Sequence, residues 1–284
     1  MRHGFLLLDK HEGPTSHDMV SAVRRTLGER DIGHLGTLDP AASGLLVLAV
    51  GRKALKVVEL FRSLPKEYTA GITFGRVSTT YDREGVIEDV QRKPGWEVPE
   101  QAVIQRTIAD RFLGRIAQVP PAHSAVHVGG ERAYRKARQG RGVALAPRDV
   151  EISRCKILSY DFPALTLDVA CGSGTYIRSL AHDLGAVLGC GAFLSSLRRT
   201  KVGAWSIDAA VTEEDVAWSA VLPLKDVLQS FVGVPLTDAQ WEDISHGRDI
   251  ALDVTPDTIA WHAELPVAIL VQAGEGKAHA RKVL

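Results

Sequence analysis

The sequence has few cysteines, no net charge and no long hydrophobic run. Cys155, Cys171 and Cys190 are odd in number, and no CxxC or paired His/Cys spacing accompanies them. A disulfide framework and a zinc site are therefore not supported, and we expect buried free thiols. The apolar run at residues 45–50 is too short to cross a bilayer, and the N-terminal run ends at Asp9. We therefore expect neither a membrane span nor a signal peptide, and we infer a cytoplasmic protein.

The 34 basic and 34 acidic residues of the 284-residue chain balance to a net charge of zero. Because non-specific nucleic-acid binding requires an excess of Lys and Arg, this balance argues against a general polyanion binder. The two signs are unevenly placed, however. Residues 1–207 carry 29 basic and 21 acidic side chains, whereas residues 208–264 carry 2 and 12. The hydrophobic content of 45% predicts a globular core in one large or two smaller domains.

Hydrophobic periodicity predicts a mixture of strands and helices. Helices are expected at residues 17–27, 53–64, 100–113, 132–138, 175–188 and 238–246. Strands are expected at residues 4–9, 45–51, 68–75, 86–90, 150–160 and 164–170. The absence of a regular βαβ rhythm favours an α+β fold with a mixed sheet. The composition shifts near residue 208, and short apolar runs after residue 257 predict a small C-terminal β-rich domain.

The glycine-rich segment GHLGTLDPAASG, residues 33–44, is the first candidate for a functional site. Its three glycines and its proline indicate a loop with unusual backbone turns, and the loop contains His34 and Asp39. Asp before Pro is common in ordinary turns and helix caps, so a purely structural role for Asp39 stays open. A polar loop that leads into a buried strand is nevertheless a common place for reactive groups.

A second glycine-rich segment, CGSGTYIR at residues 171–178, leads from a strand into a helix. Ile177 stands where a dinucleotide fingerprint needs its third small residue, so phosphate binding is the weaker interpretation. Arg178 falls in the first turn of the expected helix, where the helix dipole disfavours a positive charge. We therefore expect a carboxylate or a phosphate beside Arg178, unless the side chain is simply exposed to solvent.

Basic residues gather in two further places. Residues 132–148 contain six Lys or Arg and no acid, and their excess of Arg favours phosphate or base contacts, with a solvated helix face as the alternative. A second basic cluster consists of Arg198, Arg199 and Lys201. Tyr68, at the head of an expected strand, could pack in the core or, on an edge strand, stack on a base.

Seven blocks, in order over about residues 4–205, together resemble the TruB family, the bacterial tRNA pseudouridine-55 synthases. They are LLLDKHEGPTSHDMV, GHLGTLDPAASGLLVLAVG, KEYTAGITFG, TTYDREG, VPPAHSAVHVGGERAYRKARQG, CGSGTYIRSLAHDLG and LRRTKVG. The resemblance implies a catalytic domain at residues 1–230, with a mainly antiparallel mixed sheet flanked by helices and a basic insertion at about 120–150. Residues 231–284 would form a small RNA-binding domain of the PUA type.

The resemblance also implies roles for single residues. Asp39 matches the catalytic aspartate, Arg178 the arginine that pairs with it, and Tyr68 the tyrosine that stacks on the target uracil. Further matches to substrate-binding positions are His34, Tyr176, Leu197 and, in the basic segment that closes over the T-arm, Arg132, Arg135 and Arg138. The sequence departs from the family pattern at three other positions, His11, His123 and His127.

The implied reaction breaks the glycosidic bond of a tRNA uridine, turns the base and rejoins it through C5. The uridine must first flip out of the folded T-arm into a pocket. Asp39 must be ionised at neutral pH, and because burial alone would raise its pKa, pairing with Arg178 would keep it charged. Whether Asp39 attacks the sugar, attacks the base or abstracts a sugar proton stays open. No cofactor, metal or protein partner is implied, and we expect a monomer.

Two other functions remain open on the sequence alone. A non-catalytic RNA-binding protein on the same scaffold would bind T-arm RNA and leave its uridines unmodified. A nucleotide enzyme built on residues 171–178 would bind mononucleotides and would not need the basic segment. The charge distribution adds the expectation that residues 132–148 and 198–201 face RNA, so that neutralising them weakens tRNA binding more than equal changes after residue 208.

Overall fold

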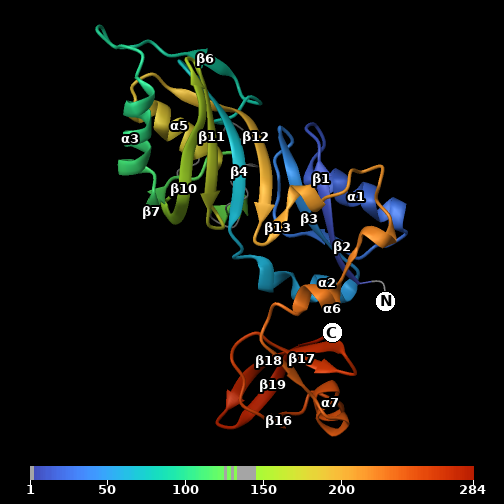
Figure 1. Ribbon diagram of the computed structural model, residues 1–284. Coiled ribbons are helices and arrows are strands. Elements are labelled where there is room, and N and C mark those ends of the chain that lie inside the picture. Colours follow the sequence, from blue (N-terminus) through green and yellow to red (C-terminus); the bar gives the residue numbers. More distant parts are fainter. Residues whose placement is uncertain (1–2, 125–126, 129–130, 133–144) are drawn as a thin grey trace.

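The computed structural model describes residues 3–124, 127–128, 131–132 and 145–284, which form two lobes built mainly of β-strands (Figure 1). The large sheet contains β1 (Gly4–Lys10), β2 (Ile32–His34), β3 (Ala42–Val50), β4 (Lys66–Phe74), β7 (Gly114–Gln118), β10 (Arg148–Asp161), β11 (Ala164–Cys171), β12 (Ala192–Val202), β13 (Trp205–Ser206) and β14 (Leu222–Pro223). Helical elements of this lobe are α1 (Ser16–Leu27), α2 (Arg52–Val57), η1 (Val58–Phe61), α3 (Gln101–Arg111), α5 (Ile177–Val187), η2 (Ile207–Ala209), η3 (Trp218–Ala220) and α6 (Leu224–Leu228).

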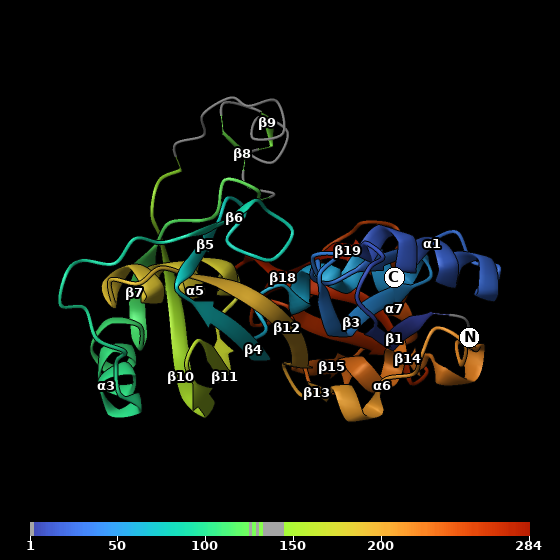
Figure 2. The same ribbon diagram turned by 90° about the horizontal axis from the view of Figure 1, so that it is seen from above.

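Two short strand pairs lie outside the large sheet, namely β5 (Arg76–Ser78) with β6 (Ile87–Asp89) and β8 (His127–Val128) with β9 (Glu131–Arg132). Figure 2 shows β8 and β9 standing away from the rest of the lobe. The C-terminal lobe contains β15 (Gly233–Pro235), α7 (Asp238–Ser245), β16 (Ile250–Ala251), β17 (Thr258–His262), β18 (Leu265–Gly274) and β19 (Lys277–Val283).

The ten-stranded sheet follows the order β14-β1-β3-β12-β4-β11-β10-β7, with β2 beside β3 and β13 beside β12. Its strands pair in antiparallel fashion, except that β3 and β12 are parallel. The mixed, mainly antiparallel sheet expected from the sequence is therefore confirmed. The parallel contact places the first residues of β3 beside the middle of β12.

Helix α1 shows how the local sequence sets an element's limits. The Thr15 hydroxyl accepts a hydrogen bond from the Asp18 N–H, and the Asp18 carboxylate accepts one from the Thr15 N–H, a reciprocal cap that contributes about 1 kcal/mol. Gly28 ends the helix in the left-handed conformation, at a φ of 63°. Between these limits, Met19 and Val23 face the core that α1 shares with β1 and β3.

The two halves of the large sheet are covered differently. Helix α1 packs on one face of β1 and β3, and α2, η1 and α6 pack on the other, so these strands are buried on both sides. Helices α3 and α5 cover one face of β4, β11 and β12 (Figure 1). Along β4, buried residues alternate with partly exposed ones, so the opposite face of that half reaches solvent.

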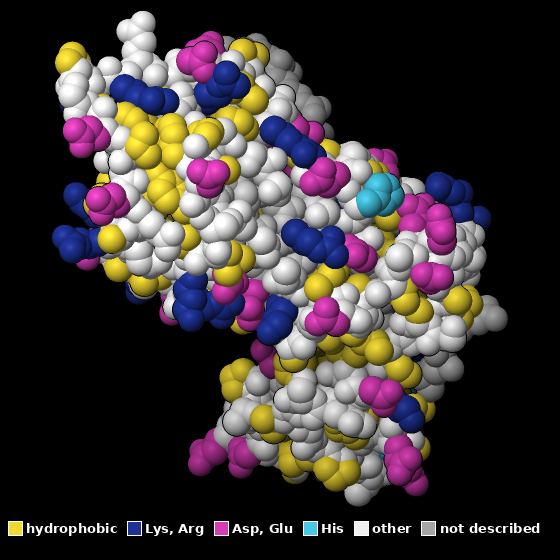
Figure 3. Space-filling view, turned by 45° about the horizontal axis from the view of Figure 1, so that its top comes forward, with side chains coloured by type: hydrophobic (Ala, Val, Ile, Leu, Met, Phe, Trp, Pro, Cys, Tyr) yellow, Lys and Arg dark blue, Asp and Glu magenta, His cyan; other side chains and the backbone are white. Residues whose placement is uncertain are grey.

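The C-terminal lobe has a five-stranded sheet, β15-β17-β18-β19-β16, and a core of its own. Buried side chains from both lobes join it to the larger lobe, among them Phe61, Ile259 and Leu284. Lys282 adds an ion pair with Glu59 of η1 at 2.7 Å. Figure 3 shows the smaller lobe below the larger one. The expected β-rich C-terminal region is confirmed, whereas the domain limits and the PUA assignment of residues 231–284 stay predictions.

Three local expectations differ from the structure. The helix expected at residues 53–64 is the short α2 followed by the 3-10 turn η1, with β-branched Val57 and Val58 at the joint. Strands β2 and β3 include both ends of the loop expected at residues 33–44. Arg132 lies in β9, paired with β8, and not at the start of a helix. The remainder of that expected helix, with Arg135 and Arg138, lies outside the described residues.

The three cysteines are free and buried, as expected. Burial raises the pKa of Cys155 to about 12 and that of Cys171 to about 11, so neither is a thiolate at neutral pH. Within the described ranges, no helix is long and apolar enough to cross a membrane. In the same part of the chain, no three His, Cys, Asp or Glu side chains gather as metal ligands would.

Candidate active site

Asp39 lies in a tight turn at the start of β3. The Ala42 N–H donates a hydrogen bond to the Asp39 carbonyl at 3.0 Å. The buried Ser16 hydroxyl fixes the preceding residue, Leu38, because it bonds the Leu38 carbonyl at 2.9 Å and the Leu38 N–H at 2.8 Å. The Asp39 side chain is 42% exposed, so it is less buried than the sequence-based argument assumed and is open to a substrate.

Two buried cations hold the same loop through its carbonyl groups. Lys10 Nζ donates to the first carbonyl of β3 at 2.6 Å, and Arg199 donates to the carbonyls of Leu45 at 2.7 Å and Gly36 at 3.0 Å. Lys10 is 0% exposed and Arg199 is 2% exposed. Burial lowers the pKa of Lys10, and the nearby charge of Asp39 opposes this shift. The backbone is therefore fixed on both sides of Asp39.

Gly44 allows β12 to approach β3 closely beside this loop. It pairs with Arg199 across the parallel contact, and a Cβ atom at Gly44 would lie 2.2 Å from the Arg199 carbonyl oxygen. The φ of Gly44 is 101°, which residues with a side chain rarely adopt. The glycine expected to serve loop conformation is thus required by strand packing.

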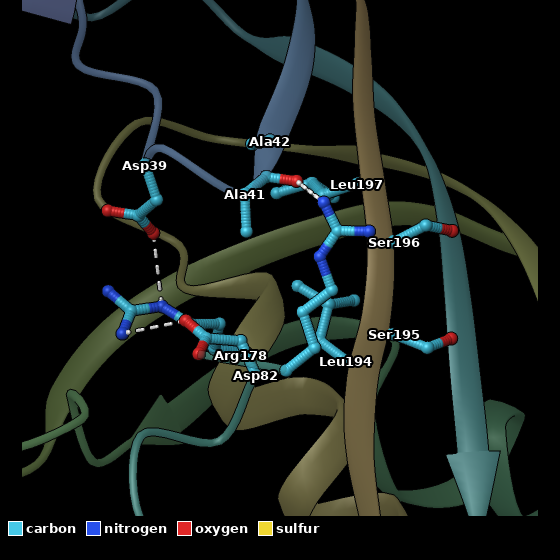
Figure 4. A pocket seen from close by; sticks show the side chains of 10 residues that line it. Asp39, Ala41, Ala42, Asp82, Arg178, Leu194, Ser195, Ser196 and Leu197 are labelled. Atoms are coloured by element: carbon cyan, nitrogen blue, oxygen red, sulfur yellow. Dashed lines mark hydrogen bonds and ion pairs between the residues drawn. The ribbon is translucent and has the colours of Figure 1, made fainter. Parts of the chain in front are cut away.

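Arg178 reaches the Asp39 loop from the first turn of α5. Its Nε lies 3.1 Å from Asp39 Oδ2, and its Nη1 lies 3.4 Å from Asp82 Oδ2 (Figure 4). Arg178 also donates to the carbonyls of Thr80 at 3.2 Å and His123 at 3.0 Å. The side chains of Arg178 and Asp82 are both buried. The anionic partner expected for a cation at a helix N-terminus is therefore present, and it is a carboxylate.

These charged groups border a small pocket. Leu194 and Leu197 of β12 provide apolar lining, and Arg83 also lines the pocket. Figure 4 shows Asp39 and Arg178 facing each other, with the β12 residues across from them. The space open to the centre of a water molecule is about 10 Å³, so the pocket has room for about one ordered water. Apolar side chains next to a carboxylate suit a flat, uncharged ring.

Tyr68 is more deeply buried than its expected stacking role suggests. It lies on β4, between β12 and β11, so the edge-strand position considered from the sequence is wrong. The side chain packs in the core with α5 and is 9% exposed. Burial raises the pKa of its hydroxyl and the Asp39 charge adds a smaller rise, while the hydrogen-bonded Arg199 opposes both.

His34 and Tyr176 do not line the pocket in this structure. His34 ends β2, and its ring centroid lies 5.6 Å from that of His17. Burial lowers the pKa of His34, and His17 lowers it further, so the imidazole is neutral at pH 7. Tyr176 precedes α5, where its N–H donates to Gln118 Oε1 at 2.8 Å. Gln118 thus occupies a backbone donor that phosphate binding at residues 171–178 would use.

The second basic cluster does not present three free cations to RNA. Arg199 is buried and bonded to carbonyls, so the expectation that this residue faces RNA is wrong. Arg198 pairs with Asp9 at 2.7 Å, and Lys201 lies 3.7 Å from Glu67. On the face shown in Figure 3, basic side chains lie beside acidic ones and do not form a single patch.

Asp82 and Arg83 were not expected from the sequence to belong to the site. The available signals were a polar segment, STTYDREG, with two acidic residues between two expected strands, and the presence of TTYDREG among the blocks of the family resemblance. The position of this segment depends on contacts with β12, where the Leu194 N–H donates to the Tyr81 carbonyl at 2.9 Å and Asp82 bridges Leu194. These contacts with β12 place Asp82 beside Arg178. The hydrophobic periodicity of the sequence does not predict such long-range contacts.

The chain is similar over most of its length to proteins of one family. Residues 24–177 match the model of the N-terminal domain of the TruB family pseudouridylate synthases. Residues 178–231 match the model of the tRNA pseudouridylate synthase B C-terminal domain. The five-stranded C-terminal sheet lies beyond the residues that these two models match.

Named relatives and solved structures point the same way. The tRNA pseudouridine synthase B of Mycobacteroides abscessus is 41% identical over 259 residues, which cover 88% of this chain and 85% of the relative. The protein of the same name from Thermobifida fusca is 41% identical over 261 residues, with 88% and 87% covered. A chain in the crystal structure of a Cbf5-Nop10-Gar1 complex is 25% identical and has a TM-score of 0.71, with coverage of 99% of this chain and 84% of that one.

Proposed function

This chain belongs to the TruB family of pseudouridine synthases, and we propose that it converts the T-loop uridine at position 55 of tRNA into pseudouridine. Activity on a tRNA uridine follows from relatives named tRNA pseudouridine synthase B that match at 41% identity over most of the chain. The observation that carries the assignment of the site is the ion pair of Asp39 with Arg178 beside a partly apolar pocket.

The reaction is an isomerisation within one nucleotide. The N1–C1′ bond breaks and a C5–C1′ bond forms, while C5 releases a proton to solvent and N1 gains one, so the electrons balance without a redox partner. Asp39 is the proposed catalytic carboxylate, and its exposed side chain can reach an entering nucleotide. Arg178 orients Asp39, and Asp82 in turn helps to hold the guanidinium. Such fixed placement of a reacting group is a main source of catalytic rate.

The proposed binding mode places the flipped uracil against Leu197. Extracting the uridine from the T-loop costs a few kcal/mol, which contacts with the pocket and the backbone offset. Because Tyr68 is buried, its proposed stacking on the uracil requires the pocket to widen toward β4. His34 and Tyr176, which lie outside the present pocket lining, are proposed to contact RNA around the flipped nucleotide.

We propose that one chain binds the T-arm without a protein partner, in the cytoplasm, where its tRNA substrate is found. The basic segment at residues 132–148, with Arg132, Arg135 and Arg138, is the proposed contact to the T-arm backbone. The C-terminal lobe is proposed to add a second, PUA-type contact to RNA.

Tritium release from [5-³H]uridine in a T-arm transcript tests the reaction, because each turnover loses the C5 proton. Wild-type protein should release tritium, and Asp39→Asn, which keeps the side-chain size but removes the charge, should not. Arg115→Gln is the matched control and should retain activity, since Arg115 forms an exposed pair with Asp149 at the β7 edge of the sheet. A transcript with cytidine at position 55 should release no label. Release by Asp39→Asn, or none by wild type, would contradict the proposal.

A further inference from the structure

Arg83 lines the pocket and directly follows Asp82 in the chain. Its Nη2 donates to Glu12 Oε2 at 2.5 Å and to the Ala41 carbonyl at 3.4 Å. Glu12 belongs to the loop between β1 and α1, and Ala41 follows Asp39 by two residues. One side chain therefore connects the three loops that carry Asp82, Asp39 and Glu12.

Both members of the Arg83–Glu12 pair are exposed to solvent, whereas in the ion pairs of Arg178 the guanidinium is buried. The Arg83 and Glu12 side chains are 41% and 42% exposed, whereas Arg178 is 8% exposed. Water and salt screen an exposed ion pair, so Arg83 can exchange one anion for another at little cost. A guanidinium binds phosphate with the same planar set of N–H donors that binds a carboxylate.

The lining and charge of the pocket give a reason for such an exchange. Arg83 and Asp39 both line the pocket, so an outward turn of Arg83 would give an entering nucleotide more room beside Asp39. The nucleotide also brings phosphates to a region where Asp39, Asp82 and Glu12 are anionic. Arg178 is already engaged by two of these carboxylates, whereas Arg83 can turn outward. A phosphate contact from Arg83 would offset the repulsion.

We propose that Arg83 binds a backbone phosphate beside the flipped uridine and that Glu12 holds Arg83 until the RNA arrives. This inference rests on the proposed function of the same site. In the RNA-free protein, Glu12 keeps the Arg83 side chain in the pocket lining. The entering phosphate displaces Glu12, and the outward turn of Arg83 widens the pocket. Glu12 is thus an internal competitor of the substrate.

Steady-state tritium release at several salt concentrations tests the inference with Arg83→Gln, Glu12→Gln and the double variant. Arg83→Gln should raise KM for the T-arm transcript roughly tenfold and reduce the slope of log KM against log salt by about one, because one phosphate contact is lost. Glu12→Gln should lower KM by a few-fold, since the competitor is removed. That gain should vanish in the Arg83→Gln background. Arg115→Gln should keep the wild-type KM and slope.

Three results would overturn the inference. One is a wild-type KM and salt slope in Arg83→Gln. Another is a KM for Glu12→Gln that does not fall below the wild-type value. An equal fall in KM with and without Arg83 would also overturn the inference, because Glu12 would then only repel the RNA and would not compete for Arg83. An inactive wild type would instead contradict the proposed function, so the two failures are distinguishable. Thermal unfolding midpoints near wild type should accompany both single variants, because both side chains are exposed.

Discussion

At the scale of single residues, Arg178 is held by two carboxylates and two carbonyls. Lysine keeps the charge but has one nitrogen, so Arg178→Lys cannot maintain the contacts to Asp39 and Asp82 together with both carbonyls. We expect kcat for tritium release to fall about a hundredfold, as for a misplaced catalytic group, with a smaller change in KM. Arg154→Lys is the control and should keep kcat, because Arg154 also bridges two carboxylates but does not line the pocket.

Arg199 is a buried guanidinium whose described partners include the carbonyls of Leu45 and Gly36. Arg199→Met keeps much of the side-chain volume but leaves these acceptors without a donor. We expect the free energy of unfolding in urea to fall by about 3 kcal/mol, and kcat to fall because the Asp39 loop loses its support. Arg198→Met, which removes a half-exposed ion pair with Asp9, should cost at most about 1 kcal/mol. Similar losses in the two variants would show that the carbonyl contacts of Arg199 are not stabilising.

At the scale of elements, a ring stack fixes the segment that carries Asp82. Tyr81 adopts a φ of 66°, and its ring stacks on His182 of α5 with centroids 3.8 Å apart. A left-handed backbone costs about 1–2 kcal/mol for a residue with a side chain, which the stack and the neighbouring strand contacts offset. We expect His182→Ala to lower kcat several-fold, because Asp82 loses its fixed position beside Arg178. His246→Ala, at the exposed end of α7, should leave kcat unchanged.

The same histidine makes stability depend on pH. Burial lowers the pKa of His182 from 6.5, and the nearby Asp183 only partly opposes this shift. Below pH 6.5 the unfolded chain therefore binds a proton that the folded chain does not, so stability present at neutral pH is lost as pH falls. We expect a lower Tm at about pH 5.5 than at about pH 7.5, and a smaller difference in His182→Ala. His34 shifts in the same direction, so part of the difference should remain in that variant.

At the scale of the whole molecule, the charge distribution predicts where RNA binds. We expect salt-sensitive tRNA binding governed by the basic segment at residues 132–148. Replacing Arg135 and Arg138 by Gln should weaken T-arm binding more than tenfold and reduce the salt slope by about two. The same replacement of Arg248 and Lys277 in the C-terminal lobe should have a much smaller effect. Filter binding at several salt concentrations measures both, and equal losses would contradict this map of the charge.

The sequence predicts the strongly periodic elements well, because burial of one face sets their pattern. The strand expected at residues 4–9 is β1, and the helix expected at residues 17–27 is α1. The contact of Arg178 with Asp39 was also predictable, from the helix dipole and the family resemblance together. The burial of Tyr68 was not, since it depends on which strands flank β4. Sheet order comes from long-range pairing, which local periodicity does not encode.

Strand β12 enters the large sheet between β3 and β4, both of which precede it by more than a hundred residues in the chain. Leu197 and Arg199, which line the pocket and hold the Asp39 loop, come from this late strand. During synthesis the loop therefore lacks the contacts from Arg199 until about 200 residues have left the ribosome. Pairing over such a separation is slow compared with hairpin formation. We therefore expect the nascent chain to gain a fully supported Asp39 loop, and with it activity, only after β12 is inserted.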